Sequence, residues 1–176
     1  GPSPVTAQEY ARFGASMAQT LPAVEEAFRT GGGVSWDAFG QLGREAQGDA
    51  NRPLFANLLG QEWLPAIGDV HDRLLADPPA RVADIACGAG WSSIAIARAY
   101  PNVAVDGYDL DEASVALARE NVAATEVADR VSIHLRDAGD PELAGSYQLV
   151  TVFEAIHDMS QPVDVLRSLR GLAAGA

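Results

Sequence analysis

The sequence predicts an α/β fold in which a mostly parallel sheet is flanked by helices. A short, apolar and partly β-branched segment, Val82–Ile85, has the pattern of a buried parallel strand. Gly88 and Gly90 follow it directly, and a helical segment comes next. Three more strand-like segments alternate with helical ones: Val103–Leu110, Val131–Asp137 and Tyr147–Glu154. This alternation is typical of a parallel sheet with crossover helices.

The chain before the first strand is helical in pattern, from residue 9 to residue 77. Glu9–Thr20 can form one helix, and we expect Leu21-Pro22 to break it, because proline suits the first turn of a new helix. Gly31–Gly33 is expected to end that second helix. Ser35 is a candidate cap for the short element that follows.

The glycine turn after the first strand is a candidate ligand-binding loop. Gly88 and Gly90 lack a Cβ, which lets the chain turn sharply and lets a ligand approach the backbone. Ser92 or Ser93 is a candidate cap for the helix that follows, whose apolar residues Ile94–Ala97 pack it onto the sheet. The first turn of that helix offers free N–H groups to a polar or anionic ligand.

The second strand ends in Asp109, which lies 21 positions after Gly88. An acidic residue about 20 positions past a glycine turn is where a second parallel strand delivers a carboxylate to a ribose diol. The alternative is that Asp109 only caps the helix that starts near Glu112. The matching distance to the glycine loop favours the ribose role.

Acidic residues also lie at or near the ends of the other strands. Ligands in open α/β sheets bind at the carboxyl ends of the strands. We therefore expect the glycine loop and these acids to converge on one edge of the sheet: Asp84, Asp109, Asp137 and Glu154.

Composition narrows the function class. The 176 residues carry a formal net charge of −12, which argues against nonspecific binding to nucleic acid or to an anionic membrane. The single cysteine, Cys87, excludes an internal disulfide and fits a reducing compartment. No stretch approaches the roughly 20 apolar residues of a membrane span. A cytoplasmic protein is predicted.

These motifs together resemble class I methyltransferases that use S-adenosylmethionine, from about Arg81 to Gly171. The first motif of that family is an acid followed by three alternate glycines after the first strand. Here it reads Asp84-Ile85-Ala86-Cys87-Gly88-Ala89-Gly90, with Ala86 in place of the first glycine. The resemblance implies a Rossmann-like fold that binds S-adenosylmethionine and releases S-adenosylhomocysteine, with no metal site.

The resemblance also implies roles for single residues. Gly88 and Gly90 would lie against the methionine part of the cofactor, and Asp109 would hold the ribose hydroxyls. Asp137 would meet the adenine amino group, with Ala138 beside it. Asp84, Ala86, Leu110 and Glu154 complete the expected cofactor-binding set.

Past the fourth strand, the segment Phe153-Glu154-Ala155-Ile156-His157-Asp158 resembles the His-Asp segment of small-molecule O-methyltransferases. In those enzymes the histidine deprotonates the acceptor hydroxyl, and a pKa near neutrality suits that task. His157 is therefore the candidate general base. It could also line the next helix without reacting, because methyl transfer can proceed by proximity alone.

The resemblance suggests two regions. Residues 1–77 would be a helical cap or lid and residues 78–176 the cofactor-binding domain, with Pro53–Asp77 as a helical run interrupted at Pro65. Several aromatic residues could close such a lid or simply pack in the core: Tyr10, Phe13, Trp36, Phe39, Phe55 and Trp63.

The family has seven strands, and the last three are expected to be missing here, with truncation after the fourth. That would leave a bare edge strand and would favour self-association, for example as a homodimer.

Three functions are compatible with the sequence. The first is methyl transfer from S-adenosylmethionine to a small-molecule acceptor, most simply a hydroxyl. The second is a non-catalytic module that binds S-adenosylmethionine and regulates an attached domain. The third, a nicotinamide-binding oxidoreductase, needs a further glycine where Ser92 or Ser93 stands.

Overall fold

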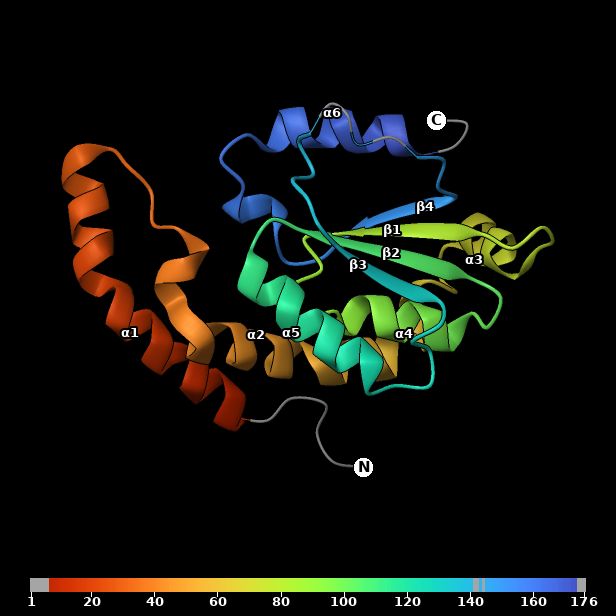
Figure 1. The fold of residues 1–176 in the computed structure, drawn as a ribbon, viewed down its shortest axis with the longest axis horizontal. Helices are drawn as coiled ribbons and strands as arrows, with labels where there is room; N and C mark the ends of the chain where they lie inside the picture. The colour runs from red at the N-terminus through yellow and green to blue at the C-terminus, as the bar shows by residue number, and fades with distance from the viewer. Residues whose placement is uncertain (1–6, 141–142, 144, 174–176) are drawn as a thin grey trace. The chain divides into compact units, whose positions relative to one another are not determined.

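The computed structural model describes residues 7–140, 143 and 145–173 (Figure 1). The chain forms two compact units that meet in the sequence between Leu54 and Phe55. The sequence predicts this division at residues 77 and 78 instead. The difference arises because the helices between Phe55 and Leu75 contribute apolar side chains to the core beside the sheet.

The first unit contains α1 (Ala7–Thr30), the 3₁₀ helix η1 (Trp36–Phe39) and α2 (Gly40–Leu54). The expected break at Pro22 is wrong, because α1 runs through it as one helix. A proline removes one backbone donor, and the strong helix formers that follow continue the helix. Gly31 ends α1 as predicted, with a φ of 74° and an N–H that donates to the Ala27 carbonyl at 2.9 Å.

Helices α1 and α2 pack closely where small residues meet. The Ser16 hydroxyl donates to the Phe39 carbonyl at 2.8 Å, and a Cβ on Gly43 would lie 2.6 Å from that hydroxyl oxygen. Arg12 joins the helices at the surface through Glu45 and Asp49. Ser35 stands at the N-cap of η1 as predicted, but its side chain makes no capping hydrogen bond.

The second unit is built on a four-stranded sheet whose paired strands are all parallel, in the order β3-β2-β1-β4. Helices α4 and α5 connect β1 to β2 and β2 to β3, and α6 follows β4. The bounds are β1 (Arg81–Ile85), α4 (Trp91–Ala99), β2 (Ala104–Asp109), α5 (Glu112–Ala123), β3 (Val131–Leu135), β4 (Leu149–Val152) and α6 (Pro162–Leu172). The predicted Rossmann-like α/β fold is confirmed.

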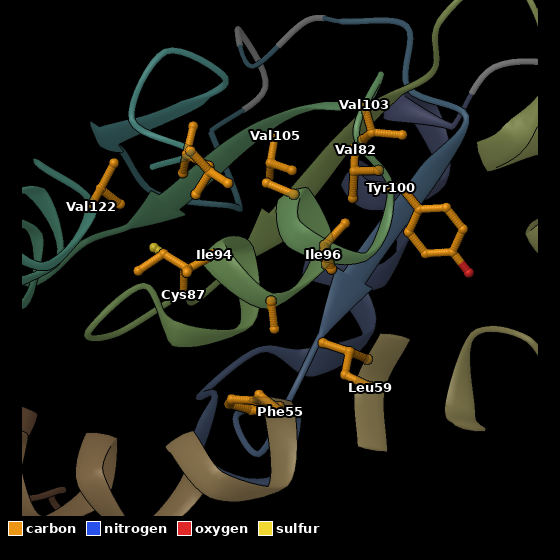
Figure 2. Close-up of a cluster of buried hydrophobic side chains, with 14 of the residues drawn as sticks. Phe55, Leu59, Val82, Cys87, Ile94, Ile96, Tyr100, Val103, Val105 and Val122 are labelled. Carbon is orange, nitrogen blue, oxygen red and sulfur yellow. The ribbon is translucent and has the colours of Figure 1, made fainter. Parts of the chain in front are cut away.

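One face of the sheet carries the larger apolar core. Helices α4 and α5 cover it in Figure 1, and the buried side chains between them and the sheet are drawn in Figure 2. The π-helix η2 (Phe55–Trp63) and α3 (Gly68–Leu75) add Phe55, Leu59 and Leu74 to this cluster. Helix η2 approaches α4 closely at Gly60. A Cβ on this residue would clash with the Cβ of Ala99, so only glycine permits the approach.

The opposite face is covered by α6 and has a smaller core. Tyr108 and Tyr147 are buried there and join their hydroxyls in a 2.6 Å hydrogen bond. Leu169 and Leu172 of α6 pack against the same cluster. This face therefore combines apolar packing with buried polar contacts.

Two boundaries differ from the predicted ones. Strand β4 is shorter than Tyr147–Glu154, because Tyr147 bridges to Ala173 and Glu154 has a φ of 53°, which ends an extended strand. The proposed caps Ser92 and Ser93 lie inside α4, whose N-cap is Gly90 with a φ of 79°. Trp91 begins α4, and its partly buried ring packs against the larger core.

Candidate cofactor-binding site

The candidate site lies where the four parallel strands end. Strand β1 leads into the glycine loop, Ala86–Gly90, and β2 ends at Asp109. Asp137 follows β3 by two residues, and Glu154 follows β4 by two residues. Because the strands are parallel, all these segments leave the sheet at the same edge.

The glycine loop has a tightly specified backbone. Ala86, Gly88 and Gly90 all have positive φ angles, of 53°, 52° and 79°. The Cys87 N–H donates to the Tyr108 carbonyl at 3.1 Å, and the Gly90 N–H donates back to the Cys87 carbonyl at 2.9 Å. The loop is therefore tied to β2 at its start and closed on itself at its end.

The two glycines of the loop serve different purposes. A Cβ on Gly88 would meet no atom within 4 Å, so this residue presents open backbone. A Cβ on Gly90 would lie 3.2 Å from the Cβ of Ala118 in α5, so this residue allows close packing. Gly88 is thus the position where a ligand can approach the main chain.

Asp109 joins the end of β2 to the glycine loop. Its Oδ2 accepts the Gly88 N–H at 2.8 Å, and its Oδ1 accepts the Asp111 N–H at 2.9 Å. The N-cap of α5 is Asp111, which accepts the Ser114 N–H, so Asp109 is not that cap. A carboxylate has about four lone-pair sites, so Asp109 can accept from a further donor.

Burial raises the pKa of Asp109, and the hydrogen bonds from the Asp111 and Gly88 amides only partly oppose this effect. The next residue in the chain, Leu110, is 70% exposed, so a large apolar side chain lies at the surface just past the end of β2. A ligand that hydrogen-bonds Asp109 could cover this side chain as well.

Asp84 is completely buried near the carboxyl end of β1. Its carboxylate accepts hydrogen bonds from the Ser92 and Ser93 hydroxyls at 2.6 Å each and from the Thr151 hydroxyl at 2.8 Å. Burial raises its pKa despite these donors. With no exposed surface, this carboxylate can affect a ligand only through the helix and strand that it holds.

The remaining predicted cofactor residues lie farther along the edge. Asp137 is exposed, and its Oδ1 accepts the Gly139 N–H at 2.8 Å. Ala138 packs against the smaller core beside α6. Glu154 is exposed and holds a left-handed backbone conformation, as Ala86 does at the end of the neighbouring strand.

His157 lies in a 3₁₀ turn, η3 (Ile156–Asp158), and its side chain is 67% exposed. Its Nε2 lies 3.4 Å from an oxygen of Asp158. Phe153 precedes this segment, and its ring centroid is 5.3 Å from that of Phe55. The imidazole is therefore accessible to solvent, and its role as a base remains a prediction.

Sequence reasoning assigned no function to two residues that shape this site. Thr151 binds Asp84, and Asn121 of α5 donates from Nδ2 to the Ala89 carbonyl at 3.0 Å. Thr151 is the one polar residue in the apolar run Leu149–Val152, and this pattern could have indicated a buried hydrogen bond. The resemblance marks Asn121 as a position where the family often carries an asparagine, but that gives it no role, because an asparagine on a helix is usually solvated.

The family model described as "Methyltransferase domain" matches residues 82–174, which is more than half of the chain. This chain is 38% identical over 81 residues to the tRNA1(Val) (adenine(37)-N6)-methyltransferases of Yersinia pestis and Yersinia pseudotuberculosis. That match covers 46% of this chain and only 28% of the length of those relatives.

Solved structures share the fold at low sequence identity. The mitomycin 7-O-methyltransferase MmcR aligns with a TM-score of 0.72 and 19% identity, over 98% of this chain and 52% of its own. A putative O-methyltransferase from Nostoc punctiforme gives a TM-score of 0.67 and 22% identity, over 93% and 49%.

A putative S-adenosyl-L-methionine-dependent methyltransferase from Methanococcus maripaludis gives a TM-score of 0.60 and 19% identity, over 75% of this chain and 58% of its own. These likenesses show a shared fold, in keeping with the parallel sheet described above. The chain belongs to the methyltransferase domain family, within the class I methyltransferases that use S-adenosylmethionine.

Proposed function

We propose that this chain is the cofactor-binding part of an enzyme that transfers a methyl group from S-adenosylmethionine to a hydroxyl of a small-molecule acceptor. The observation that carries the proposal is the contact of Asp109 with Gly88. This contact places the Asp109 carboxylate, which can accept hydrogen bonds at both oxygens, next to the uncovered Gly88 backbone where the parallel strands end. A ribose diol and the methionine part of the cofactor need these two features together.

The residues present fit this cofactor. Asp109 can accept from a further donor such as a ribose hydroxyl, and Gly88 leaves space where a side chain would stand. The exposed carboxylates of Asp137 and Glu154 add negative charge to the edge, which favours a ligand with a sulfonium and an ammonium group. When bound, S-adenosylmethionine supplies an electrophilic methyl group.

The charge of the chain bears on the acceptor. The relatives that methylate tRNA favour a second candidate, transfer to an RNA base. RNA binding depends on Lys and Arg contacts to phosphates, whereas this chain has a net charge of −12. The aromatic pair Phe55 and Phe153 beside the edge instead supports an apolar acceptor. We therefore favour the small molecule.

His157 is the proposed base. A hydroxyl is a weak nucleophile until its proton is removed, and an exposed imidazole at this edge can accept that proton at Nδ1 when Nε2–H faces Asp158. Asp158 lies within reach of the ring and would hold its orientation and stabilise the imidazolium that forms. A cytoplasmic location is part of the proposal, supported by the free Cys87.

The first test is calorimetric titration of this chain with S-adenosylmethionine and S-adenosylhomocysteine. We expect saturable binding, and a loss of roughly 10- to 100-fold in affinity for Asp109→Ala, because hydrogen bonds to a charged group contribute about 1.5–3 kcal/mol. Asp129→Ala is the matched control, since this exposed acid lies before β3, at the opposite edge. Equal affinity in Asp109→Ala would contradict the ribose role.

The second test addresses catalysis in the full-length protein. Formation of S-adenosylhomocysteine is measured with a panel of small phenols and alcohols and, separately, with tRNA. His157→Ala should lower turnover by on the order of 100-fold without changing cofactor affinity. Unchanged turnover would remove His157 as the base. Cofactor binding without turnover on any acceptor would support the regulatory module instead, and turnover on tRNA alone would support the RNA candidate.

A further inference from the structure

Asn121 contacts the glycine loop from outside the loop itself. It lies near the end of α5, is partly buried, and donates from Nδ2 to the Ala89 carbonyl at 3.0 Å. Ala89 stands between the two loop glycines. The contact therefore joins a helix on the larger core to the centre of the loop.

This hydrogen bond fixes one peptide group at both ends. The carbonyl of the Ala89–Gly90 peptide accepts from Asn121, and its N–H donates to the Cys87 carbonyl at 2.9 Å. A peptide unit is planar, so two opposed hydrogen bonds leave it little freedom to rotate. The Gly88 N–H beside it donates to Asp109 at 2.8 Å, so the loop is held at two neighbouring points.

A second contact from the same helix supports the loop. Ala118 lies one turn before Asn121 and is the residue against which Gly90 packs, with an ideal Cβ distance of 3.2 Å. The two positions share one face of α5 because they are three residues apart. Helix α5 begins just after Asp109, so it holds the loop at Ala89 and Gly90 while Asp109 holds it at Gly88.

We propose that Asn121 is a positioning residue for the cofactor pocket. It holds the Ala89–Gly90 peptide so that the Gly88 backbone stays open to the ligand at a fixed distance from Asp109. This inference rests on the proposed function, because the ligand that the loop receives is S-adenosylmethionine. Asn121 itself need not touch that ligand.

The test compares three variants of this chain by calorimetric titration with S-adenosylhomocysteine. Asn121→Ala should weaken binding roughly 2- to 12-fold, the range expected for one lost hydrogen bond. Asn121→Asp should weaken it further, because a carboxylate oxygen would face the Ala89 carbonyl. Glu120→Ala, on an exposed neighbouring position of the same helix, should bind like the unchanged chain.

A second measurement separates positioning from general stability. Amide hydrogen exchange, followed by NMR, should accelerate at Gly88 and Gly90 in Asn121→Ala, while the amides of Val82 and Ala83 in β1 keep their rates. A purely structural role would accelerate all four together through global unfolding. Unchanged exchange at the two glycines, or affinity within twofold of the unchanged chain, would overturn the inference.

The two proposals fail in different ways. If the unchanged chain does not bind the cofactor product, the proposed function of this chain fails, and the exchange rates still decide whether Asn121 holds the loop. If the unchanged chain binds and Asn121→Ala binds equally well, only the role of Asn121 fails. Asn121→Gln, which keeps the amide, serves as the second variant if Asn121→Asp does not fold.

Discussion

Two carboxylates on neighbouring strands show how strongly the surroundings decide the behaviour of an acid. Asp84 of β1 points toward α4 and meets three hydroxyls. Asp106 of β2 contacts Arg81 at 2.6 Å and His134 at 3.0 Å. Burial alone would raise both pKa values, yet the pKa of Asp84 is raised and that of Asp106 is lowered.

The difference lies in the charge of the partners. Hydroxyl donors only partly replace the water that Asp84 has lost. The hydrogen bonds of His134 and Arg81, together with the positive charge of Arg81, outweigh the burial of Asp106. As the pH falls, protonation of Asp84 therefore stabilises the fold and protonation of Asp106 destabilises it. Substitutions can test each effect separately.

The largest effect is expected for Asp84→Ala. Removing this carboxylate leaves three buried hydroxyls without their common acceptor, which should lower the free energy of unfolding by about 2–3 kcal/mol. Urea denaturation at pH 7, followed by circular dichroism, measures it. A loss below about 0.5 kcal/mol would show that the hydroxyls find other acceptors at no cost.

Asp84→Asn is the matched control for that variant, because it keeps the shape and removes only the ionisation. Since the folded-state pKa of Asp84 is raised, the unchanged chain gains stability from this group as pH falls through that pKa. We expect Asp84→Asn to lack this gain. A variant with the same pH dependence as the unchanged chain would contradict the raised pKa.

A smaller and opposite effect is expected for Asp106→Asn. The variant should lose about 1 kcal/mol at pH 7, because the partners Arg81 and His134 are both partly exposed to solvent. A lowered folded-state pKa gives stability that is complete above the ordinary carboxyl pKa and is lost as pH falls through the folded value. The difference between the two proteins should therefore shrink below about pH 4. A stability difference between the unchanged chain and Asp106→Asn that grows as the pH falls would contradict the lowered pKa of Asp106.

The smallest effect is expected for Ala86→Gly, which leaves both carboxylates in place and changes only the backbone between β1 and the loop. Ala86 has a φ of 53°, a region that costs a residue with a Cβ about 1–2 kcal/mol. Glycine removes that cost. It also raises the conformational entropy of the unfolded chain, which lowers the free energy of unfolding by about 0.4–1 kcal/mol. The net gain in the free energy of unfolding should lie between about 0 and 1.6 kcal/mol, measured by thermal unfolding. A clear loss of stability would mean that the alanine methyl group packs usefully.

Much of the second unit was predictable, because strands and ligand loops leave periodic and local signals. The apolar run at Val82–Ile85 and the glycines after it predicted the first strand and loop, and the spacing predicted that Asp109 lies at the same edge of the sheet as that loop. These features depend on few residues close in sequence, which is why a single sequence carries them.

The features that were missed depend on contacts between distant residues. Pro22 looks like a break in any local window, and only the structure shows α1 continuing through it. Ser92 and Ser93 have the composition of helix caps, yet their hydroxyls turn to Asp84, eight and nine positions earlier in the chain. The π-helical turn of η2 leaves no periodic signature of its own, since its packing depends on Gly60 meeting Ala99.

Trp91 gives the glycine loop an optical probe that needs no label. It directly follows Gly90, and its ring packs partly buried against the larger core. Indole emission responds to local polarity and to nearby quenching groups. The chain has only two other tryptophans, Trp36 and Trp63, and phenylalanine at those positions would leave a single emitter beside the loop. The arrival of a ligand could then be followed by stopped-flow fluorescence in real time.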